Sequence, residues 1–503
     1  MEVIVVEPYI LVLDEGTTST RAVLFNKETK IVDEEQLPLA ITTPQFGFVE
    51  QDPNEIIEKS IRVVKAVVER ARANERNIQC LAVTNQRTAT TVMDRATGKP
   101  LSPVISWQDA RAADDARKLA AEMGEEYTAR TGLMPAAANC GLHILHLFKN
   151  EDLKARSGTG ELLIGTPDTL VIKALTGNDY TSSSNASSTG LLDQHTGEWW
   201  QEFIERNGAS VHDLPTVLPE DGDYGYTRAD VVGAEIPVRA VVADQQSALF
   251  GHGGLKPGSV KCTHGTGSFI DFNIGDRIVT DTNGLDNRFA WRTAGSNTNI
   301  IEGSTWVSGS AIEWLIDDMK VLRNAAEIDK VCTESKGLET IVVPALAGFA
   351  APYWDGKARG TVFGLSRHTT SADIVRATIE GIAHTVVDLL ELITSMAGTE
   401  VSVLTVDGGL SRSNYLQQFT ADLLNATVER TSDPSYVTAR GAAWMAGVNA
   451  GVWESLEDAA KTLRVEQRFE PQMSEAERLA QRKAWRDAID RSLGWTPKLP
   501  QEG

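Results

Sequence analysis

Two short turns built from glycine and threonine limit most strongly what this chain can fold into. Gly16-Thr17-Thr18 interrupts the apolar segment Tyr9–Asn26, and Gly265-Thr266-Gly267 interrupts the apolar segment Ser259–Ile274 in the same way. An apolar run on each side of a tight turn is typical of a β-hairpin. The recurrence of this hairpin in the two halves of the chain predicts two domains of like fold.

The segments that follow each hairpin support the prediction of an internal repeat. In the first half, a third strand is expected at Ile31–Leu39, then a helix, then a buried strand at Cys80–Thr84. In the second half, strands are expected at Asn287–Thr293 and Asn299–Glu302, before a helix that begins near Ser308. Each half is therefore predicted to be an α/β unit.

The length of the chain agrees with this organisation. Its 503 residues exceed the size at which one hydrophobic core usually serves a whole chain. No low-complexity linker separates the halves. We expect an N-terminal domain over residues 1–252 and a C-terminal domain over residues 253–503.

Capping residues predict where several helices begin. Asp52 is expected to be an N-cap, with Glu55 completing a capping box. Ser371 is expected to cap a long helix over Ser371–Ile393, and Ser474 with Glu477 predicts the start of a surface helix near the end of the chain.

Composition excludes several classes of function. Lys and Arg number 48 against 69 Asp and Glu, and a net charge of −21 repels nucleic acids and anionic membranes. The four cysteines are far apart in the sequence and do not form the pattern of a disulfide framework. A reducing, cytoplasmic location is therefore expected. The start Met-Glu-Val-Ile-Val-Val-Glu-Pro lacks the basic region of a secretory signal, and no apolar run reaches the length of a membrane span.

The first turn carries groups suited to binding phosphate. Its glycine lets backbone N–H groups approach phosphate oxygens without a Cβ atom in the way, and Thr17 and Thr18 add hydroxyl donors. Asp14, at the end of the preceding strand, is the kind of carboxylate that holds Mg²⁺ or its waters beside phosphates. The alternative is an ordinary hairpin turn with Asp and Thr as turn formers. The matching turn at Thr266 and Gly267 favours a clamp of two facing turns.

A third glycine turn follows another apolar strand. Asp407-Gly408-Gly409 ends the strand Val401–Val406 and precedes Ser413 and a helical segment. Paired glycines at a strand-to-helix turn permit close approach of a flat base or ribose. The pattern is not the dinucleotide fingerprint, and no Walker-type G-x-x-x-x-G-K-[ST] is present in the sequence.

Asp244 is the strongest candidate for a catalytic group. It stands at the carboxyl end of the apolar strand Val238–Ala243, and sites in open α/β sheets lie outside such ends. A carboxylate there can take a proton from a hydroxyl during phosphoryl transfer. The alternative is that Asp244 is simply the N-cap of a helix over Gln245–Gly251.

Taken together, these motifs resemble a known family. The chain resembles the FGGY carbohydrate kinases, and among them the glycerol kinases, over nearly its whole length. The motifs that carry the resemblance come in family order: Asp14-Glu15-Gly16-Thr17-Thr18-Ser19-Thr20-Arg21, Thr84-Asn85-Gln86-Arg87, Trp107-Gln108-Asp109-Ala110-Arg111, Gly165-Thr166-Pro167-Asp168-Thr169, Ala243-Asp244-Gln245-Gln246, His264-Gly265-Thr266-Gly267, Ala351-Pro352-Tyr353-Trp354-Asp355, Arg359-Gly360 and Val406-Asp407-Gly408-Gly409.

The resemblance implies two ribonuclease-H-like domains of the actin-type ATPase fold that close on ATP, Mg²⁺ and a small polyol or sugar. It implies that Asp244 is the general base and that Asp14 serves the Mg²⁺, directly or through water. The nucleotide-binding residues that it implies are Thr17, Thr18, Ser19, Arg21, Thr266, Gly267, Gly309, Glu313, Gly409 and Ser413. The substrate-binding positions that it implies are Arg87, Thr88, Trp107, Ala138, Asp244, Gln245 and Phe269.

Several positions depart from the glycerol kinase pattern. Glycerol kinases place Glu where this chain has Thr88 and Tyr where it has Ala138, and both family residues bind glycerol. Their loss removes two polar groups and opens space, which favours a four- or five-carbon polyol or ketose over glycerol. Glu313 stands in place of a usual Gln, and Ser413 in place of a frequent Asn.

Other expectations rest on the same resemblance. The loop before Val238 lacks the stretch that binds fructose bisphosphate in some bacterial relatives, so that inhibition is not expected. Family members are often dimers or tetramers, which makes a homo-oligomer a further expectation. Three alternatives stay open: a glycerol kinase proper, an actin-like ATPase without a small substrate, and a binding protein that has lost catalysis. Asp14 and Asp244 are both retained within well-matched motifs, which argues against a binding protein that has lost catalysis. The sequence does not identify the sugar.

Overall fold

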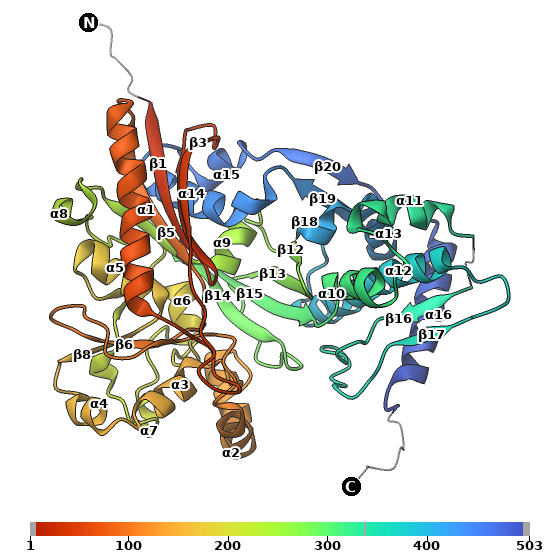
Figure 1. The fold of residues 1–503 in the computed structure, drawn as a ribbon, viewed down its shortest axis with the longest axis horizontal. Helices are drawn as coiled ribbons and strands as arrows, with labels where there is room; N and C mark the ends of the chain where they lie inside the picture. Colours follow the sequence, from red (N-terminus) through yellow and green to blue (C-terminus); the bar gives the residue numbers. More distant parts are fainter. Residues whose placement is uncertain (1–6, 337–338, 496–503) are drawn as a thin grey trace, which may run out of the picture.

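The computed structural model describes residues 7–336 and 339–495 (Figure 1). Residues 1–6, on which the expectation about a secretory signal partly rests, lie outside this range. Figure 1 shows two lobes, one built mainly from the red to yellow first half of the chain and the other from the green to blue second half. Each lobe contains one large mixed sheet.

The N-terminal sheet has five strands in the order β11-β5-β1-β2-β3. Strands β1, β2 and β3 are joined as antiparallel hairpins, and β5 and β11 lie parallel to β1. This confirms the predicted series of three hairpin-linked strands, a helix and a buried strand. The bounds are β1 Pro8–Glu15, β2 Ser19–Phe25, β3 Ile31–Pro38, β5 Asn77–Asn85 and β11 Val238–Ala243.

Strand β1 is buried on both faces because its side chains alternate between two hydrophobic clusters. Leu11 and Leu13 pack with helix α1 (Pro53–Ala73) on one face. Ile10 and Val12 pack on the other face, against residues from the far end of the chain. Fully burying such a side chain contributes about 1.5–3 kcal/mol, so a continuous apolar run is what a central parallel strand requires.

The helix that covers the second face is α14 (Val437–Asn449), which comes from the C-terminal half of the sequence. Its residues Ala439, Ala442 and Ala446 pack with Ile10 and other residues of the N-terminal strands. The small side chains let α14 lie close to the sheet. The core of the N-terminal lobe therefore includes a helix from beyond residue 253, and the boundary expected at residue 252 stays a prediction.

The C-terminal sheet has seven strands in the order β14-β15-β13-β12-β18-β19-β20. Strands β12, β13 and β15 repeat the hairpin series of β1, β2 and β3, and β18 and β19 lie parallel to β12 as β5 and β11 do to β1. Strand β14 is an addition that pairs with the outer edge of β15. The bounds are β12 Ser259–His264, β13 Ser268–Gly275, β14 Asp286–Thr293, β15 Ser296–Thr305, β18 Val403–Gly408, β19 Thr427–Thr431 and β20 Val465–Phe469.

Shorter strands and further helices complete the two lobes. The shorter strands are β4 Glu50–Gln51, β6 Thr91–Asp94, β7 Val104–Ile105, β8 Leu162–Gly165, β9 Tyr180–Ser182, β10 Thr216–Leu218, β16 Ile341–Val343 and β17 Thr361–Phe363. The remaining helices of the first half are α2 Ala113–Thr131, α3 Cys140–Leu147, α4 Glu151–Arg156, α5 Pro167–Thr176, α6 Ser183–Ser187, α7 Gln201–Arg206, α8 Ala229–Val232 and α9 Asp244–Gly251. Those of the second half are α10 Gly309–Glu313, α11 Ile328–Glu334, α12 Ser371–Ala397, α13 Asn414–Leu424, α15 Leu456–Ala460 and α16 Glu475–Ser492.

The predicted helix starts are correct in part. Ser474 and Glu477 form the expected capping box at α16, and Asp52 is the N-cap of α1. Glu55 does not complete a box, because its carboxylate instead accepts the Ala40 N–H at 3.2 Å and pairs with Lys59.

The cap of the long helix α12 differs from the prediction by one residue. The N-cap is Thr370 rather than Ser371, and Thr370 forms a reciprocal capping box with Asp373. Thr370 has the extended backbone of an N-cap, and a carboxylate three residues later returns to its N–H. The acid at the third position decides which of two neighbouring hydroxyl residues is the cap.

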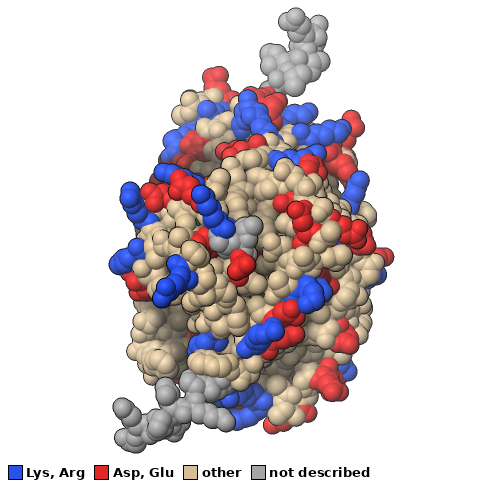
Figure 2. Space-filling model, turned by 90° about the vertical axis from the view of Figure 1, so that its right-hand side faces the viewer, with Lys and Arg blue, Asp and Glu red and all other residues tan. Residues whose placement is uncertain are grey.

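The surface carries both signs of charge. On the face shown in Figure 2, Lys and Arg alternate with Asp and Glu, and no continuous area of one sign covers this side. Across the described ranges, no helix combines the length and apolarity that crossing a membrane would require.

Candidate active site

Three parallel strands of the N-terminal sheet end at one edge, and each carries a predicted site residue there. In the strand register Asp14 lies opposite Thr84, and Thr84 lies opposite Val242. Arg87 follows the end of β5, and Asp244 follows the end of β11. The carboxyl ends of parallel strands meet at the same edge, so the sheet itself brings these groups together.

Asp244 is held by a cation and by its own helix. Its Oδ1 lies 3.3 Å from Arg87 Nε and accepts the Gln245 N–H at 2.7 Å. Burial raises the pKa of Asp244, while Arg87, the Gln245 N–H and Lys261 act against that shift. The side chain is 30% exposed, so it faces the cleft although it is mostly enclosed. The cations beside this carboxylate favour its ionised form.

The helix after β11 begins one residue earlier than expected. Asp244 is the first residue of α9, and Ala243 is the N-cap. Asp244 is therefore not an N-cap in the structure, and its bond to the neighbouring Gln245 N–H is a local contact within the first turn.

Two aromatic side chains stand open beside these groups. Trp107 and Phe269 are each 43% exposed. The Trp107 Nε1–H donates to the Thr17 hydroxyl at 3.0 Å, which joins a predicted substrate residue to the first phosphate turn. Phe269 lies on β13 of the other domain.

The two substituted positions of the predicted substrate pocket are also open. Thr88 has a φ of 57°, which is rare for a β-branched residue and is typical of functional sites. Ala138 is half-buried in the loop before α3. The neighbouring Asn139 is buried, and its Oδ1 accepts the Ala136 N–H at 2.6 Å. In this arrangement Asn139 is committed to the loop rather than to the space beside Ala138.

The first predicted phosphate turn has partly free donors. Thr18 is exposed, and the Thr17 hydroxyl accepts the Trp107 N–H. The Ser19 hydroxyl instead accepts from Gln36 Nε2 at 2.9 Å. Ser19 is thus turned toward β3.

The second predicted turn rests against α10. The Gly309 N–H donates to the Gly265 carbonyl at 2.9 Å, and the Ser310 N–H donates to the Thr266 carbonyl at 3.2 Å. A Cβ at Gly267 would lie 2.1 Å from the Thr305 carbonyl oxygen, so no larger residue fits there. Gly309 therefore lies beside the turn that carries Thr266, and its contact with the nucleotide stays a prediction.

Arg21 has a different set of partners from the one expected for a nucleotide residue. Its Nη2 lies 2.8 Å from Asp14 Oδ2 and donates to the Ser435 carbonyl at 2.8 Å. The guanidinium also lies over the Tyr436 ring, 4.5 Å from the centroid. Arg21 links the two domains and steadies Asp14.

The acidic groups at this edge fit a divalent cation. Burial raises the pKa of Glu15 to about 8, with further raising contributions from Asp14 and Asp244, while Gln86 acts to lower it. Glu15 Oε1 is buried and has no hydrogen-bond partner among the described residues. Mg²⁺ needs few protein carboxylates, and a cation here would relieve the repulsion between them. Within the described ranges no cluster of three or more metal-ligating side chains occurs.

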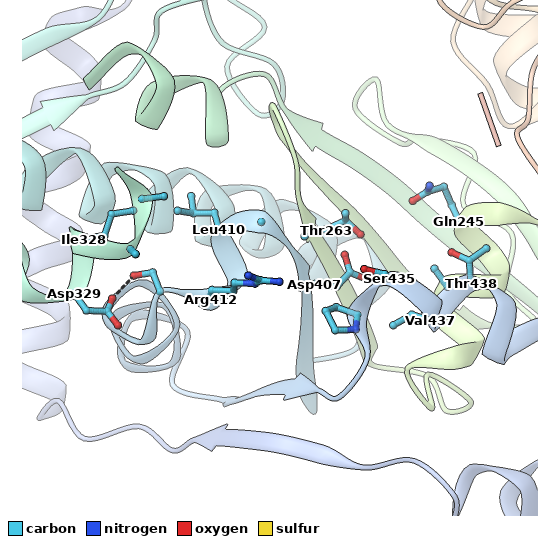
Figure 3. Close-up of a pocket in the computed structure, with 17 residues that line it drawn as sticks. Gln245, Thr263, Ile328, Asp329, Asp407, Leu410, Arg412, Ser435, Val437 and Thr438 are labelled. Carbon is cyan, nitrogen blue, oxygen red and sulfur yellow. Dashed lines mark hydrogen bonds between the residues drawn. The ribbon is translucent and has the colours of Figure 1, made fainter. Parts of the chain in front are cut away.

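A cavity of about 770 Å³ lies between the domains (Figure 3). Figure 3 shows Ile328, Asp329 and Leu410 at one end and Gln245 and Thr438 at the other. The predicted nucleotide residues Gly409 and Ser413 line it.

Two contacts shape the wall of this cavity. The Asp329 carboxylate accepts the Ser413 hydroxyl at 2.6 Å and the Asn414 N–H at 2.9 Å, which fixes the start of α13. Gly408 has a φ of 83°, and a Cβ there would lie 2.3 Å from the His264 carbonyl oxygen. The backbone after β18 can therefore approach a ligand closely.

One predicted nucleotide residue lies apart from this cavity. Glu313 is exposed at the end of α10 and is not among the residues that line the cavity. Asp407, by contrast, lines the cavity, and its Oδ2 lies 2.7 Å from His252 Nε2 (Figure 3).

Sequence reasoning missed several residues that shape the site. They are Lys261, Asp271, Arg288, Glu302, Asp329 and Ser435. A signal was present for some of them, because charged residues in otherwise apolar strands need partners. The partners lie on strands far apart in the sequence, and only the register shows which ones meet.

Two domains of the actin-type ATPase fold, with the Asp244 carboxylate beside Arg87 at the edge of the N-terminal sheet, are the arrangement of an ATP-dependent phosphotransferase. Comparison with protein families agrees: residues 9–251 match the N-terminal domain and residues 260–450 match the C-terminal domain of the FGGY family of carbohydrate kinases. The chain belongs to this family.

Individual relatives point the same way. A glycerol kinase from Thermococcus gammatolerans is 40% identical over 97% of this chain and 99% of its own length. Glycerol kinase 2 from Thermotoga maritima is 39% identical with the same coverage. The crystal structure of Plasmodium falciparum glycerol kinase with ADP superposes with a TM-score of 0.93 at 29% identity, covering 97% of this chain and 99% of that one.

Proposed function

We propose that this protein transfers the terminal phosphoryl group of ATP to a primary hydroxyl of a small polyol or sugar with four or five carbons. The observation that carries the proposal is the Asp244 carboxylate, 3.3 Å from Arg87 Nε, together with the exposed rings of the predicted substrate residues Trp107 and Phe269. An ATPase without a small substrate has no use for this second pocket.

The mechanism follows from the positions of these groups. Asp244 accepts the proton of the attacking hydroxyl while that oxygen forms its bond to the terminal phosphorus, and ADP leaves with the electron pair of the broken bond. Arg87 keeps Asp244 ionised and orients it. Trp107 and Phe269 enclose the carbon chain and exclude water, which limits hydrolysis of ATP.

The phosphates and the metal are assigned to the two turns. Thr17, Thr18, Thr266 and Gly267 would hold the phosphates, and Gly409 and Ser413 would lie beside the nucleoside. Mg²⁺, when bound, neutralises the phosphate charge, and Asp14 would hold it or its waters. In so acidic a protein this neutralisation is needed for ATP to bind at all.

Further parts of the proposal concern the whole molecule. We place the domain boundary at residues 252 and 253, at the end of α9. All four cysteines are buried and free, which supports a reducing, cytoplasmic location. A homodimer or homotetramer is proposed from the family resemblance.

A second candidate substrate is glycerol itself. The names of the relatives favour it, whereas Thr88 and Ala138 favour a longer chain. Both candidate substrates would be phosphorylated by the same chemistry. They differ only in the size of acceptor pocket that each requires.

The experiment is a coupled assay of ADP release from ATP over glycerol, erythritol, threitol, xylitol, xylulose and ribulose. Wild type should turn over with at least one acceptor, and Asp244→Asn should lower kcat by about 10²–10⁴-fold while an ATP analogue still binds. Asp223→Asn is the matched control, because Asp223 is exposed and also pairs with an arginine. Turnover that no acceptor stimulates would favour an actin-like ATPase, and normal kcat in Asp244→Asn would remove the base from its role.

A further inference from the structure

A row of charged residues crosses four strands of the C-terminal sheet. In the register, Lys261 on β12 lies opposite Asp271 on β13, Asp271 opposite Glu302 on β15, and Glu302 opposite Asp286 on β14. Like charges in directly opposite positions are destabilising, and this row contains two such acidic pairs. The arrangement needs cations from outside the row.

Two arginines supply these cations, and both meet at Glu302. Arg87 reaches across from the N-terminal domain and places Nη1 2.7 Å from Glu302 Oε2. Arg288 on β14 places Nε 3.3 Å from Glu302 Oε1 and Nη2 2.6 Å from Asp286. Burial acts to raise the pKa of Glu302, but the two guanidinium groups outweigh it and hold the pKa well below its usual range.

These contacts form a wall that leads away from the proposed base. Asp244, Arg87, Glu302 and Arg288 follow one another, each within 3.3 Å of the next. The far end of the wall touches the loop that carries the alanines, because Asp286 Oδ1 accepts the Met134 N–H at 3.3 Å. The wall thus contacts this loop at Met134, four residues before Ala138.

Parts of the wall's side chains remain accessible. Arg87 Nη1, Arg288 Nε and Glu302 Oε2 are buried and engaged in the ion pairs, so a ligand would meet the exposed parts of these side chains rather than these atoms. Glu302 and Arg288 remain 17% and 9% exposed. A carboxylate can accept from one hydroxyl while the guanidinium beside it donates to the neighbouring hydroxyl, a pairing that suits a vicinal diol.

We infer that Glu302 and Arg288 bind the distal hydroxyls of the acceptor and so select a neutral polyol or ketose longer than glycerol. The inference rests on the proposed kinase function and names the substrate class of that same site. The row and the wall together hold four carboxylates and three cations, which leaves no surplus cation for an acidic sugar; they are Asp244, Asp271, Glu302 and Asp286 with Lys261, Arg87 and Arg288.

The alternative is that the wall only holds the domains together. A structural role predicts that loss of Arg288 weakens the protein and lowers kcat/KM for every acceptor alike. A role in binding predicts that the ratio of kcat/KM between acceptors changes, because glycerol is too short to reach Arg288.

The test compares kcat/KM of wild type and Arg288→Met on glycerol, erythritol, threitol, xylitol, xylulose and ribulose. For the acceptor that wild type prefers, kcat/KM should fall about 10- to 100-fold more than for glycerol. Arg288→Lys keeps the positive charge but loses the paired N–H donors of the guanidinium, so it should recover part of the difference in kcat/KM between the acceptors. Arg292→Met removes a guanidinium on the same strand that bonds backbone carbonyls, and it should leave the ratio unchanged.

The outcomes separate the two proposals. An equal fall for all acceptors in Arg288→Met, or a wild-type preference for glycerol of tenfold or more, overturns the inference and leaves the kinase function standing. If the wild-type protein phosphorylates none of the acceptors, both the inference about Glu302 and Arg288 and the proposed kinase function are overturned. If Arg288→Met does not fold, as judged by binding of an ATP analogue, the same ratio is read from Arg288→Lys.

Discussion

Lys261 Nζ donates a hydrogen bond of 2.6 Å to Gln245 Oε1 and so joins the two domains beside the proposed base. Gln245 directly follows Asp244 at the start of α9, whereas Lys261 lies on β12 of the C-terminal sheet. Lys261 is fully buried and also lies 2.8 Å from Asp271. The first turn of α9 is therefore positioned by groups from both domains, and the geometry of Asp244 depends on how they meet.

Gln245→Ala should destabilise the protein and lower kcat. The substitution removes a hydrogen bond to a charged group, which is worth about 1.5–3 kcal/mol, so the free energy of unfolding in urea should fall by about that amount. Gln36→Ala is the control, because Gln36 donates to the Ser19 hydroxyl at an exposed position. An equal decrease in the free energy of unfolding in the two variants would show that the hydrogen bond between Lys261 and Gln245 stabilises the protein no more than an exposed one does.

Arg87→Met should move the acid limb of the kcat/KM profile to higher pH. The proposed base acts when ionised, so activity is lost as pH falls through the pKa of Asp244. Burial raises that pKa and Arg87 opposes the rise, so removing Arg87 raises the pKa further. The measurement is the pH dependence of kcat/KM at saturating ATP.

A loss of activity in Arg87→Met would not by itself show that Arg87 opposes the rise in the pKa of Asp244, since Arg87 is also expected to contact the acceptor. Arg95→Met provides a control, because Arg95 is a similarly enclosed arginine that pairs with Asp179 away from the site. An acid limb that stays in place, or that moves equally in the control, contradicts the assignment of Asp244 as the group that titrates.

Asp14→Ala should raise the concentration of Mg²⁺ needed for half-maximal activity and lower kcat together. The phosphates need a cation in this acidic protein, and Asp14 is the carboxylate next to the first turn. A Mg²⁺ titration of the coupled assay measures both effects. Asp33→Ala also breaks a pair with an arginine, Arg70, but on the outer strand β3, and its titration should match wild type. An unchanged titration in Asp14→Ala would exclude the metal role.

The parts of the fold that could be predicted from the sequence are local. The hairpins around Gly16 and Gly265 and the strand that ends at Asp244 are visible because an apolar run and its turn are neighbours in the chain. Family resemblance brought in Arg87 and Trp107, which contact Asp244 and Thr17 respectively, and their role in binding the acceptor stays a prediction.

The parts that could not be predicted depend on contacts between distant segments. Arg21 bonds the Ser435 carbonyl, 414 positions away, so its role between the domains is invisible in the sequence. Asp271 and Glu302 face each other only because β13 and β15 pair in one register, and a shift of one residue would turn both away. The N-cap Thr370 was not predicted because the adjacent Ser371 is an equally good capping residue by sequence alone.

The last prediction concerns the size of the acceptor pocket, and it uses the double variant Thr88→Glu with Ala138→Tyr. These changes restore the two polar side chains that the resemblance to glycerol kinases implies at the pocket. Each restored hydrogen bond to a substrate hydroxyl should be worth about 0.5–1.5 kcal/mol, so kcat/KM for glycerol should rise about 10- to 100-fold relative to erythritol and xylulose. The tyrosine also fills space beside Ala138, which should lower kcat/KM for the longer acceptors themselves.

The local structure supports the use of this variant. Thr88 has a φ of 57°, and glutamate has no β-branch, so the backbone should accept the change at least as well as it accepts threonine. Asn139 is bound to the Ala136 N–H and is not free to replace the missing tyrosine. Ala136→Tyr is the control, because Ala136 lies in the same loop but is exposed. If the ratio of glycerol to erythritol is the same in the double variant, the control and wild type, then Thr88 and Ala138 do not set the length of the acceptor.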